Sequence, residues 1–385
     1  ARTYSPGSLR PETARALYGA ELHFSSSRID VLAGCRFAHF LQYGLRAQER
    51  EPAEFDSRFY GTFVHDVLEH VVQQTEREGG FAAVPRSRVQ ELAQERMEQN
   101  AQTLLETFPD SGRTGYLLRR TFDEVTQVVD ELYDELSVSA FRPKFCELEF
   151  SARGALPGVA FAGERCRGVV EGFVDRVDVW QSGGRPYVRV VDYKTGKKSF
   201  DYTNVLHGRG LQMLLYLFAL VRQGGHLLHG EPLPAGVLYF PARIERVSVR
   251  DRLAQAEIEK ERRKQLRRSG VLLNSDPVLE AMEPCGGSPR FLPYTLDKEG
   301  RKTGDLASFV QLAQLERFVF QTVAALGDEL ADGRIDPDPC IRDAKDSACA
   351  FCPYSEVCAG HEQPRWLKKI TAEEFWQTLE RREHG

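Results

Sequence analysis

The stretches VVEGFVDRVDVW (residues 169–180) and VRVVDYKTGKK (residues 188–198) decide how this chain folds. Both are rich in Val and aromatic residues, as β-strands are, and Gly183 and Gly184 between them predict a hairpin turn. Residues two apart in a strand point to the same face, so Asp192 and Lys194 project together. Pairing of the two strands would bring Asp175 close to Asp192.

Two neighbouring aspartates beside a lysine predict a site for a hard divalent cation. Mg²⁺ and Mn²⁺ prefer carboxylate oxygens, and such a cation polarises a phosphoryl group and activates a water molecule. The ammonium of Lys194 would steady the attacking water or the developing charge. The pattern therefore favours metal-assisted phosphodiester cleavage. The alternative is that these strand-end charges are solvated or form a simple salt bridge.

The hydrophobic pattern predicts helices first, then strands, then helices again. Helical patterns cover 27–46, 86–108, 114–139, 251–270 and 306–332 and the segments that begin at Gly61 and Leu211; strand patterns cover 144–152, 167–180, 186–194 and the segment that begins at Pro234. This order predicts an α/β fold with a mixed sheet and a helical accessory layer.

The same pattern suggests how the domain is bounded. We expect a polar N-terminal tail at 1–24, a single domain at 25–362 with its core at about 140–245, and a C-terminal helical tail at 363–385. The stretch 271–305 is rich in Pro, Gly and charge and predicts a mobile loop.

Three cysteines lie within ten residues in SACAFCPYSEVCAG (residues 347–360). Cys349, Cys352 and Cys358 have the spacing of thiolates that grip Zn²⁺ or an iron–sulfur cluster. Either centre usually takes a fourth ligand, which could be Cys35, Cys340 or His361. The alternative is a surface loop with cysteines and no metal.

The composition is globular, and the formal net charge of −5 excludes a globally basic protein. Contact with nucleic acid would need a local basic surface. One candidate is the run at 251–270, which a solvated helix face explains equally well, and a second is the cluster of Lys194, Lys197, Lys198 and Arg209.

The sequence carries no recognisable membrane-spanning or secretion signal. The sequence has no apolar run long enough to span a membrane and no secretion signal, which points to the reducing cytoplasm. It lacks an initiating Met, so we expect a fragment or a processed chain.

Three further residues stand beside the acidic strands. His65 lies on the helix that begins near Gly61, where a histidine is either structural or a ligand. Gln212 and Tyr216 are four residues apart and share a helix face. Tyr216 by itself would be read as core, whereas an amide in so apolar a helix needs polar partners.

With these residues in hand, the chain resembles the RecB-type branch of the PD-(D/E)XK nucleases, and within it the nuclease region of AddB-type helicase–nuclease subunits. The resemblance runs from about Ser25 to about Gly360. It rests on motifs that occur in the family's order: SRIDVLAGCRFAHFLQYGLRAQERE (27–51), GTFVHDVLEH (61–70), EGFVDRVDV (171–179), VVDYKTG (190–196), GLQMLLYLFAL (210–220) and the cysteine segment. It implies a restriction-endonuclease-like mixed sheet with a helical layer.

The resemblance also implies roles for single residues. The catalytic Mg²⁺ or Mn²⁺ would be bound by His65, Asp175, Asp192 and the carbonyl of Tyr193. Lys194 would be the catalytic lysine, and Gln212 and Tyr216 would position the DNA backbone or brace the site. A 4Fe–4S cluster would be held by Cys35, Cys349, Cys352 and Cys358 as a staple between the two ends of the domain, with Cys340 as a bystander. Asp178 has the opposite strand parity to Asp175 and should face away.

The function implied is a divalent-metal-dependent deoxyribonuclease that cuts single-stranded DNA during double-strand-break processing, beside a helicase–nuclease partner of AddA type. No G-x4-G-K-[ST] loop occurs in the chain, so we expect no ATP hydrolysis from it. Two other interpretations remain open at this point. One is a catalytically silent iron–sulfur module that binds DNA or acts as a scaffold, and the other is a zinc-binding structural protein unrelated to DNA.

Overall fold

The computed structural model describes residues 7–47, 57–107, 112–196, 198–244, 255–358 and 364–384. A mixed sheet of eight strands forms its centre, with β1, β4, β5, β6, β7 and β10 in that order and β2 and β3 both paired with β4. The strands are β1 (Leu22–Ser25), β2 (Arg142–Phe150), β3 (Val159–Ala162), β4 (Arg167–Ser182), β5 (Arg185–Lys194), β6 (Leu233–Pro241), β7 (Ser269–Leu273) and β10 (Leu306–Ala307). The predicted mixed α/β fold is confirmed.

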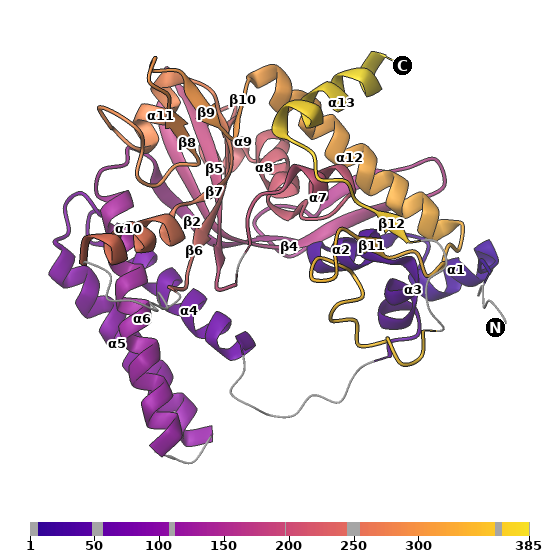
Figure 1. Cartoon of the computed structure of the whole chain (residues 1–385), viewed down its shortest axis with the longest axis horizontal. Helices are drawn as coiled ribbons and strands as arrows, with labels where there is room; N and C mark the ends of the chain where they lie inside the picture. Colours follow the sequence, from indigo (N-terminus) through magenta and orange to yellow (C-terminus); the bar gives the residue numbers. More distant parts are fainter. Residues whose placement is uncertain are drawn as a thin grey trace.

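The long strand β4 organises this sheet (Figure 1). Its first part pairs with β1 and β3, and its second part pairs with β2 and β5. The β4–β5 turn is the predicted glycine hairpin, in which Gly183 and Gly184 have φ angles of 57° and 76°. Two successive positive φ angles suit glycine and match the twist of a tight hairpin.

A helical crossover joins β5 to β6, because parallel strands cannot be connected by a hairpin. This connection contains α7 (Tyr202–Leu206), α8 (Gln212–Gln223) and α9 (Gly225–Leu228). The apolar helix α8 packs against both strands, and its residues from Met213 to Leu220 are buried. The crossover therefore holds Gln212 and Tyr216 near the carboxyl end of β5.

Two groups of helices lie at opposite ends of the sheet (Figure 1). At one end are α4 (Ser57–Arg77), α5 (Arg86–Thr107), α6 (Gly112–Leu136) and α10 (Gln255–Leu266). At the other are α1 (Pro11–Tyr18), α2 (Ser26–Gly34), α3 (Arg36–His39) and the π-helical turn Phe40–Gly44. The long helix α12 (Phe309–Ala331) packs on α8, and α13 (Ala372–His384) packs on α12.

The expected N-terminal tail is wrong for the residues from Pro11 onward. Ala14, Tyr18, Leu22 and Phe24 are buried, and β1 forms a parallel pair with β4. The sheet also takes strands from 269–273 and 306–307, so its core is wider than 140–245. Residues 363–385 were expected as a tail, but Phe375, Trp376 and Leu379 of α13 are buried against the body of the protein.

The predicted mobile loop at 271–305 is also wrong. This segment contains the end of β7, helix α11 (Asp276–Met282) and the hairpin of β8 (Tyr294–Leu296) and β9 (Lys302–Gly304). The helix expected at 251–270 ends at Leu266, and its first residues lie outside the described part. Gly270 explains the change to strand, because a Cβ there would lie 1.9 Å from the carbonyl oxygen of Val237 on β6. Only glycine allows the two backbones to approach so closely.

Candidate active site

Three carboxylates lie in one row across β2, β4 and β5. Cys146 and Leu148 of β2 pair with Arg176 and Val174 of β4, and Arg176 pairs in turn with Val191 of β5. This register places three side chains opposite one another on neighbouring strands: Glu147, Asp175 and Asp192. Residues opposite each other share a face of the sheet. The predicted approach of Asp175 to Asp192 follows from this pairing.

His65 of α4 completes this group from outside the sheet. Donor atoms of His65, Glu147 and Asp175 all lie within 4.8 Å of one another. Nδ1 of His65 is 3.6 Å from Oδ2 of Asp175, and Nε2 is 3.0 Å from the carbonyl oxygen of Tyr193. The helix therefore delivers an imidazole to the end of the carboxylate row.

Burial and neighbouring negative charge raise the pKa of two carboxyl groups of the site, Asp175 and Glu147. Burial, together with the charge of Asp192, raises the pKa of Asp175 to about 6. Burial and the charges of Asp175, Glu69 and Asp192 raise the pKa of Glu147 to about 7. Carboxylates that repel one another in a partly buried site are stabilised by a shared cation. One imidazole and hard carboxylate oxygens fit Mg²⁺ or Mn²⁺.

The side chain of Lys194 places a positive charge beside the carboxylates. Its ammonium contacts Oδ2 of Asp192, whose side chain is 6% exposed, whereas the lysine side chain is 24% exposed. The contact holds the ammonium beside the carboxylate row while it stays accessible to solvent. A group placed in this way can donate to a water molecule or to a phosphoryl oxygen.

Glu147 is the site residue that the sequence did not reveal. It lies in a strand with a second glutamate, Glu149, at the same parity. Its φ angle of 48° is in the left-handed region, which is strained for a residue with a side chain. The sequence could have revealed Glu147 only through the alternation of side chains along β2. That alternation places Glu147 beside Asp175 only when the register of β2 on β4 is known.

Gln212 and Tyr216 lie on the helix that follows the site. Tyr216 is buried, stacks on Phe150 with 4.9 Å between the ring centres, and donates to the carbonyl of Glu171 at 3.4 Å. Burial, together with the charge of Asp192, raises its pKa. Gln212 is the first residue of α8 and is only partly buried. In this geometry Tyr216 braces the sheet behind the site.

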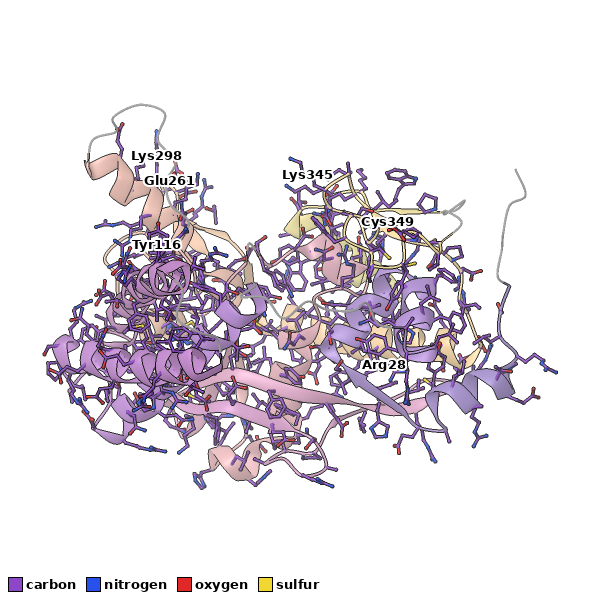
Figure 2. All side chains as sticks on the ribbon, turned by 90° about the horizontal axis from the view of Figure 1, so that it is seen from below. Arg28, Tyr116, Glu261, Lys298, Lys345 and Cys349 are labelled. Atoms are coloured by element: carbon purple, nitrogen blue, oxygen red, sulfur yellow. The ribbon has the colours of Figure 1, made fainter. Side chains whose placement is uncertain are left out.

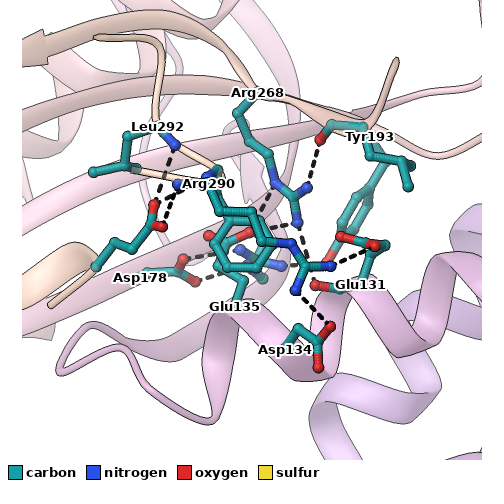
Figure 3. Close-up of polar contacts among 12 residues, drawn as sticks. Glu131, Asp134, Glu135, Asp178, Tyr193, Arg268, Arg290 and Leu292 are labelled. Atoms are coloured by element: carbon teal, nitrogen blue, oxygen red, sulfur yellow. Dashed lines mark hydrogen bonds and ion pairs between the residues drawn. The ribbon is translucent and has the colours of Figure 1, made fainter. Parts of the chain in front are cut away.

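A buried ion network supports the row from the other face of β4 (Figure 3). Arg176 and Arg189 both pair with Asp178, Arg189 also pairs with Glu135 at 3.0 Å, and all four side chains are almost fully buried. Glu135 is shared with Arg268. Asp178 faces away from Asp175, as its strand parity predicts. Arg176 also donates to the hydroxyl of Tyr193 at 3.0 Å, which ties the network to the site.

Four cysteines line one small cavity beside α2 and α3. The cavity has a volume of about 220 Å³ and is lined by Cys35, Cys349, Cys352 and Cys358 with mainly apolar neighbours. Figure 2 shows Cys349 on the other lobe from Tyr116 and Glu261. Cys35 lies at the break between α2 and α3, where its φ angle of −163° interrupts the helix. All eight cysteines lie in described segments, and none forms a disulfide.

The two other candidates for a fourth metal ligand were Cys340 and His361, and neither is among the described residues that line this cavity. Cys340 is fully buried, donates to the carbonyl of Ala33 at 3.4 Å and does not line this cavity. His361 lies outside the described residues. Burial raises the pKa of the Cys35 thiol to about 11, and the charges of Asp338 and Cys349 act in the same direction. Four thiols gathered in an apolar pocket fit a metal centre that would neutralise their thiolates.

The chain belongs to the PD-(D/E)XK nuclease superfamily, whose family model matches residues 23–359. The chain is also similar to the B-type subunits of ATP-dependent helicase/deoxyribonucleases. It is 34% identical to the one from Moorella thermoacetica over 91% of this chain and 31% of the relative. It is 29% identical to that of Thermoanaerobacter sp. over 95% of this chain and 33% of the relative. The expected resemblance to AddB-type subunits is confirmed.

The chain is much shorter than the relatives that it matches. A third relative, from Oceanobacillus iheyensis, is 28% identical over 92% of this chain and 31% of its own length. The chain thus spans about a third of the length of the curated relatives it matches. Among the helices of the described segments, none combines the length and hydrophobicity needed to cross a bilayer.

Proposed function

We propose that this chain is a divalent-metal-dependent deoxyribonuclease that hydrolyses phosphodiester bonds of single-stranded DNA. The observation that carries the proposal is the convergence of His65, three carboxylates and Lys194 at one end of the sheet. Membership of a nuclease superfamily supports it, as does the word deoxyribonuclease in the names of the relatives.

The residues of the site have two roles, cation binding and hydrogen-bond donation to the reacting groups. The cation would be held by His65, Glu147, Asp175, Asp192 and the Tyr193 carbonyl. Mg²⁺ or Mn²⁺ bound there would supply polarisation of the phosphoryl oxygen and a more acidic water. Asp192 orients the ammonium of Lys194 through their ion pair. The ammonium of Lys194 donates to the nucleophilic water or to the oxygen on which charge develops.

We propose that the enzyme works inside a helicase–nuclease complex with a partner subunit of AddA type. The names of the relatives include an ATP-dependent helicase, whereas this sequence has no nucleotide-binding G-x4-G-K-[ST] loop. A motor partner would therefore unwind the duplex and deliver single strands during double-strand-break processing and recombinational repair. The complex would act in the cytoplasm, where a reducing environment keeps cysteine thiols available.

We propose that the four cysteines hold a 4Fe–4S cluster, as the family resemblance implies. Their side chains line one cavity of about 220 Å³ with mainly apolar neighbours, and four thiolates are the ligand set of such a cluster. Cys35 and Cys349 are more than 300 residues apart in the sequence, so a shared centre would close a very long loop. We propose that the cluster acts as a staple rather than as a redox agent.

Cleavage of labelled single-stranded DNA tests the proposed function directly. The native chain should cut in Mg²⁺ or Mn²⁺, and Asp192→Ala should not. Glu149→Gln is the matched control, because Glu149 lies on the same strand as Glu147 and its carboxylate bonds to Ser151. Equal cutting by native chain and Asp192→Ala would show that the site is misassigned. No cutting by the native chain in any metal or salt would favour the catalytically silent iron–sulfur module.

A further inference from the structure

A basic pocket opens at the carboxyl ends of the parallel strands β5 and β6. Its volume is about 310 Å³, and its walls come from the segment after β5, the segment after β6 and the residues that lead into β7. Lys194 belongs both to this pocket and to the candidate active site. Ligands commonly bind outside the carboxyl ends of parallel strands.

The charge of the pocket is of one sign. Four of the described residues that line it are cationic and none is acidic; the cations are Lys194, Lys198, Arg243 and Arg267. Lys194 contacts Asp192, but the other three form no ion pair with any described carboxylate. Asp30 is close enough to interact electrostatically with Lys198, yet its carboxylate accepts its hydrogen bond from the backbone of Gly210.

Each of these three cations is held by neutral groups instead. Nζ of Lys198 lies 5.4 Å from the ring centre of Tyr239, and the guanidinium of Arg243 lies 5.0 Å from that of Tyr60. Arg267 donates to the backbone carbonyls of Leu292 and Tyr294. Such contacts orient a cation without neutralising it. The positive charge of the pocket therefore stays available to an anion.

We propose that this pocket binds the backbone phosphate next to the scissile one, and so sets the path of the DNA strand past Lys194. The proposal rests on the proposed nuclease function and adds a substrate subsite to it. Contacts with phosphates position a strand without reading its sequence. The pocket should therefore act equally on DNA of any sequence.

The test measures binding without cleavage. In an Asp192→Ala background, the affinity for a labelled single-stranded oligonucleotide is measured by fluorescence anisotropy between about 50 and about 200 mM NaCl. Replacing Lys198 and Arg243 together by Ala should weaken binding and reduce the slope of log K against log [NaCl] by about 0.7, because one phosphate contact of the single strand is lost. Arg267 is left intact because it also holds two backbone carbonyls.

Lys298→Ala is the control, because this exposed lysine carries the same charge and does not line the pocket. An unchanged thermal melting curve for the Lys198→Ala/Arg243→Ala protein shows that it is folded. If its affinity and salt slope equal those of the control, the phosphate subsite does not exist. Competition with inorganic phosphate separates the two anion sources: Lys198-dependent phosphate binding that leaves DNA binding unaffected would overturn the backbone assignment.

These outcomes are independent of the cleavage assay. The salt slope needs no catalysis, so the subsite can fail while Asp192→Ala still abolishes cutting. In the catalytically intact chain, loss of the subsite should raise KM for DNA more than it lowers kcat. Equal cutting by the native chain and Asp192→Ala would instead defeat the nuclease assignment, whatever the salt slope is.

Discussion

The backbone N–H of Tyr193 donates a hydrogen bond to Oδ2 of Asp175, with 2.6 Å between the two atoms. The carbonyl of the same tyrosine faces His65, and its hydroxyl accepts from Arg176 of the buried network. One residue of β5 thus connects the carboxylate row to the ion network behind it. The orientation of Asp175 on β4 therefore depends on its contact with β5.

Glu147→Gln should weaken Mn²⁺ binding at least about tenfold, because even groups outside the coordination shell cost 10–100-fold when they are lost. The substitution keeps the size of the side chain and removes one negative charge from a group within 4.8 Å. Isothermal titration with Mn²⁺ measures the change. Glu149→Gln should bind as the native chain does, and an unaltered affinity in Glu147→Gln would exclude Glu147 as a ligand.

Lys194→Ala should slow single-turnover cleavage by about 10²–10³-fold, the usual effect of losing one preorganised donor. Metal affinity should not fall, since removing a positive charge beside Asp192 favours a bound cation. Rapid-quench cleavage and Mn²⁺ titration separate the two effects, with Lys298→Ala as the surface control. A parallel loss of metal affinity would mean that Lys194 merely positions Asp192.

Glu135 should make stability depend on pH in the acid range. Burial opposes its ionisation, but Arg268 and Arg189 outweigh burial and lower its pKa to about 2. A carboxyl with a lowered pKa stabilises the fold above its unfolded value of about 4.5, and this contribution is lost as the pH falls toward 2. The network should therefore weaken across that interval.

Glu135→Gln should lower the free energy of unfolding at neutral pH by about 3–5 kcal/mol, because it leaves buried guanidinium groups without their partner. It should also flatten the loss of stability between pH 4.5 and 2. Denaturant unfolding at several pH values measures both. Glu231→Gln removes a carboxylate whose side chain is 90% exposed and should change stability by less than about 0.5 kcal/mol. If the free energy of unfolding depends on pH in the same way in the native chain and in Glu135→Gln, Glu135 is not the source of the acid-range dependence.

Cys352→Ala should abolish the visible absorbance expected of the proposed 4Fe–4S cluster and lower the melting temperature. The chain-entropy model sets an upper limit of about 6 kcal/mol for closing so long a loop. The loss should be smaller than this limit, because Arg36 already pairs with Glu329 and Asp338 and ties α3 to the C-terminal segment. Chelation or oxidation of the native chain should likewise reduce stability before it affects the metal site.

Cys285→Ala is the matched control for this measurement. Cys285 is only partly buried and lies outside the four-cysteine cavity. A melting temperature in Cys352→Ala equal to that of Cys285→Ala would remove the staple hypothesis, even if the colour were lost.

Gly172→Ala should destabilise the sheet by about 1–3 kcal/mol, as overpacking does. A Cβ at this position would lie 2.2 Å from the hydroxyl of Tyr216, and the φ angle of 154° is unfavourable for alanine. Tyr216→Phe should recover part of the loss, because the ring carbon is 3.4 Å away. A double-mutant cycle by thermal unfolding measures the coupling, and strict additivity would contradict the contact.

The acidic hairpin could be predicted because its signals are local. The parity of Asp175, Asp192 and Lys194 follows from the two-residue period of a strand, and the turn follows from the two glycines. The helices α4, α8 and α12 were predicted for the same reason, because a helical period appears within a single segment.

Local sequence patterns therefore predict the elements and the chemistry that each carries. The folded chain shows which of them meet: Glu147 with Asp175, β1 with β4, and Cys35 with the last cysteines. The strand at 269–273 needed β6 as its partner before it could be distinguished from the helix before it. The physical reason is that these pairings depend on register and packing between distant segments, and no local periodicity encodes either.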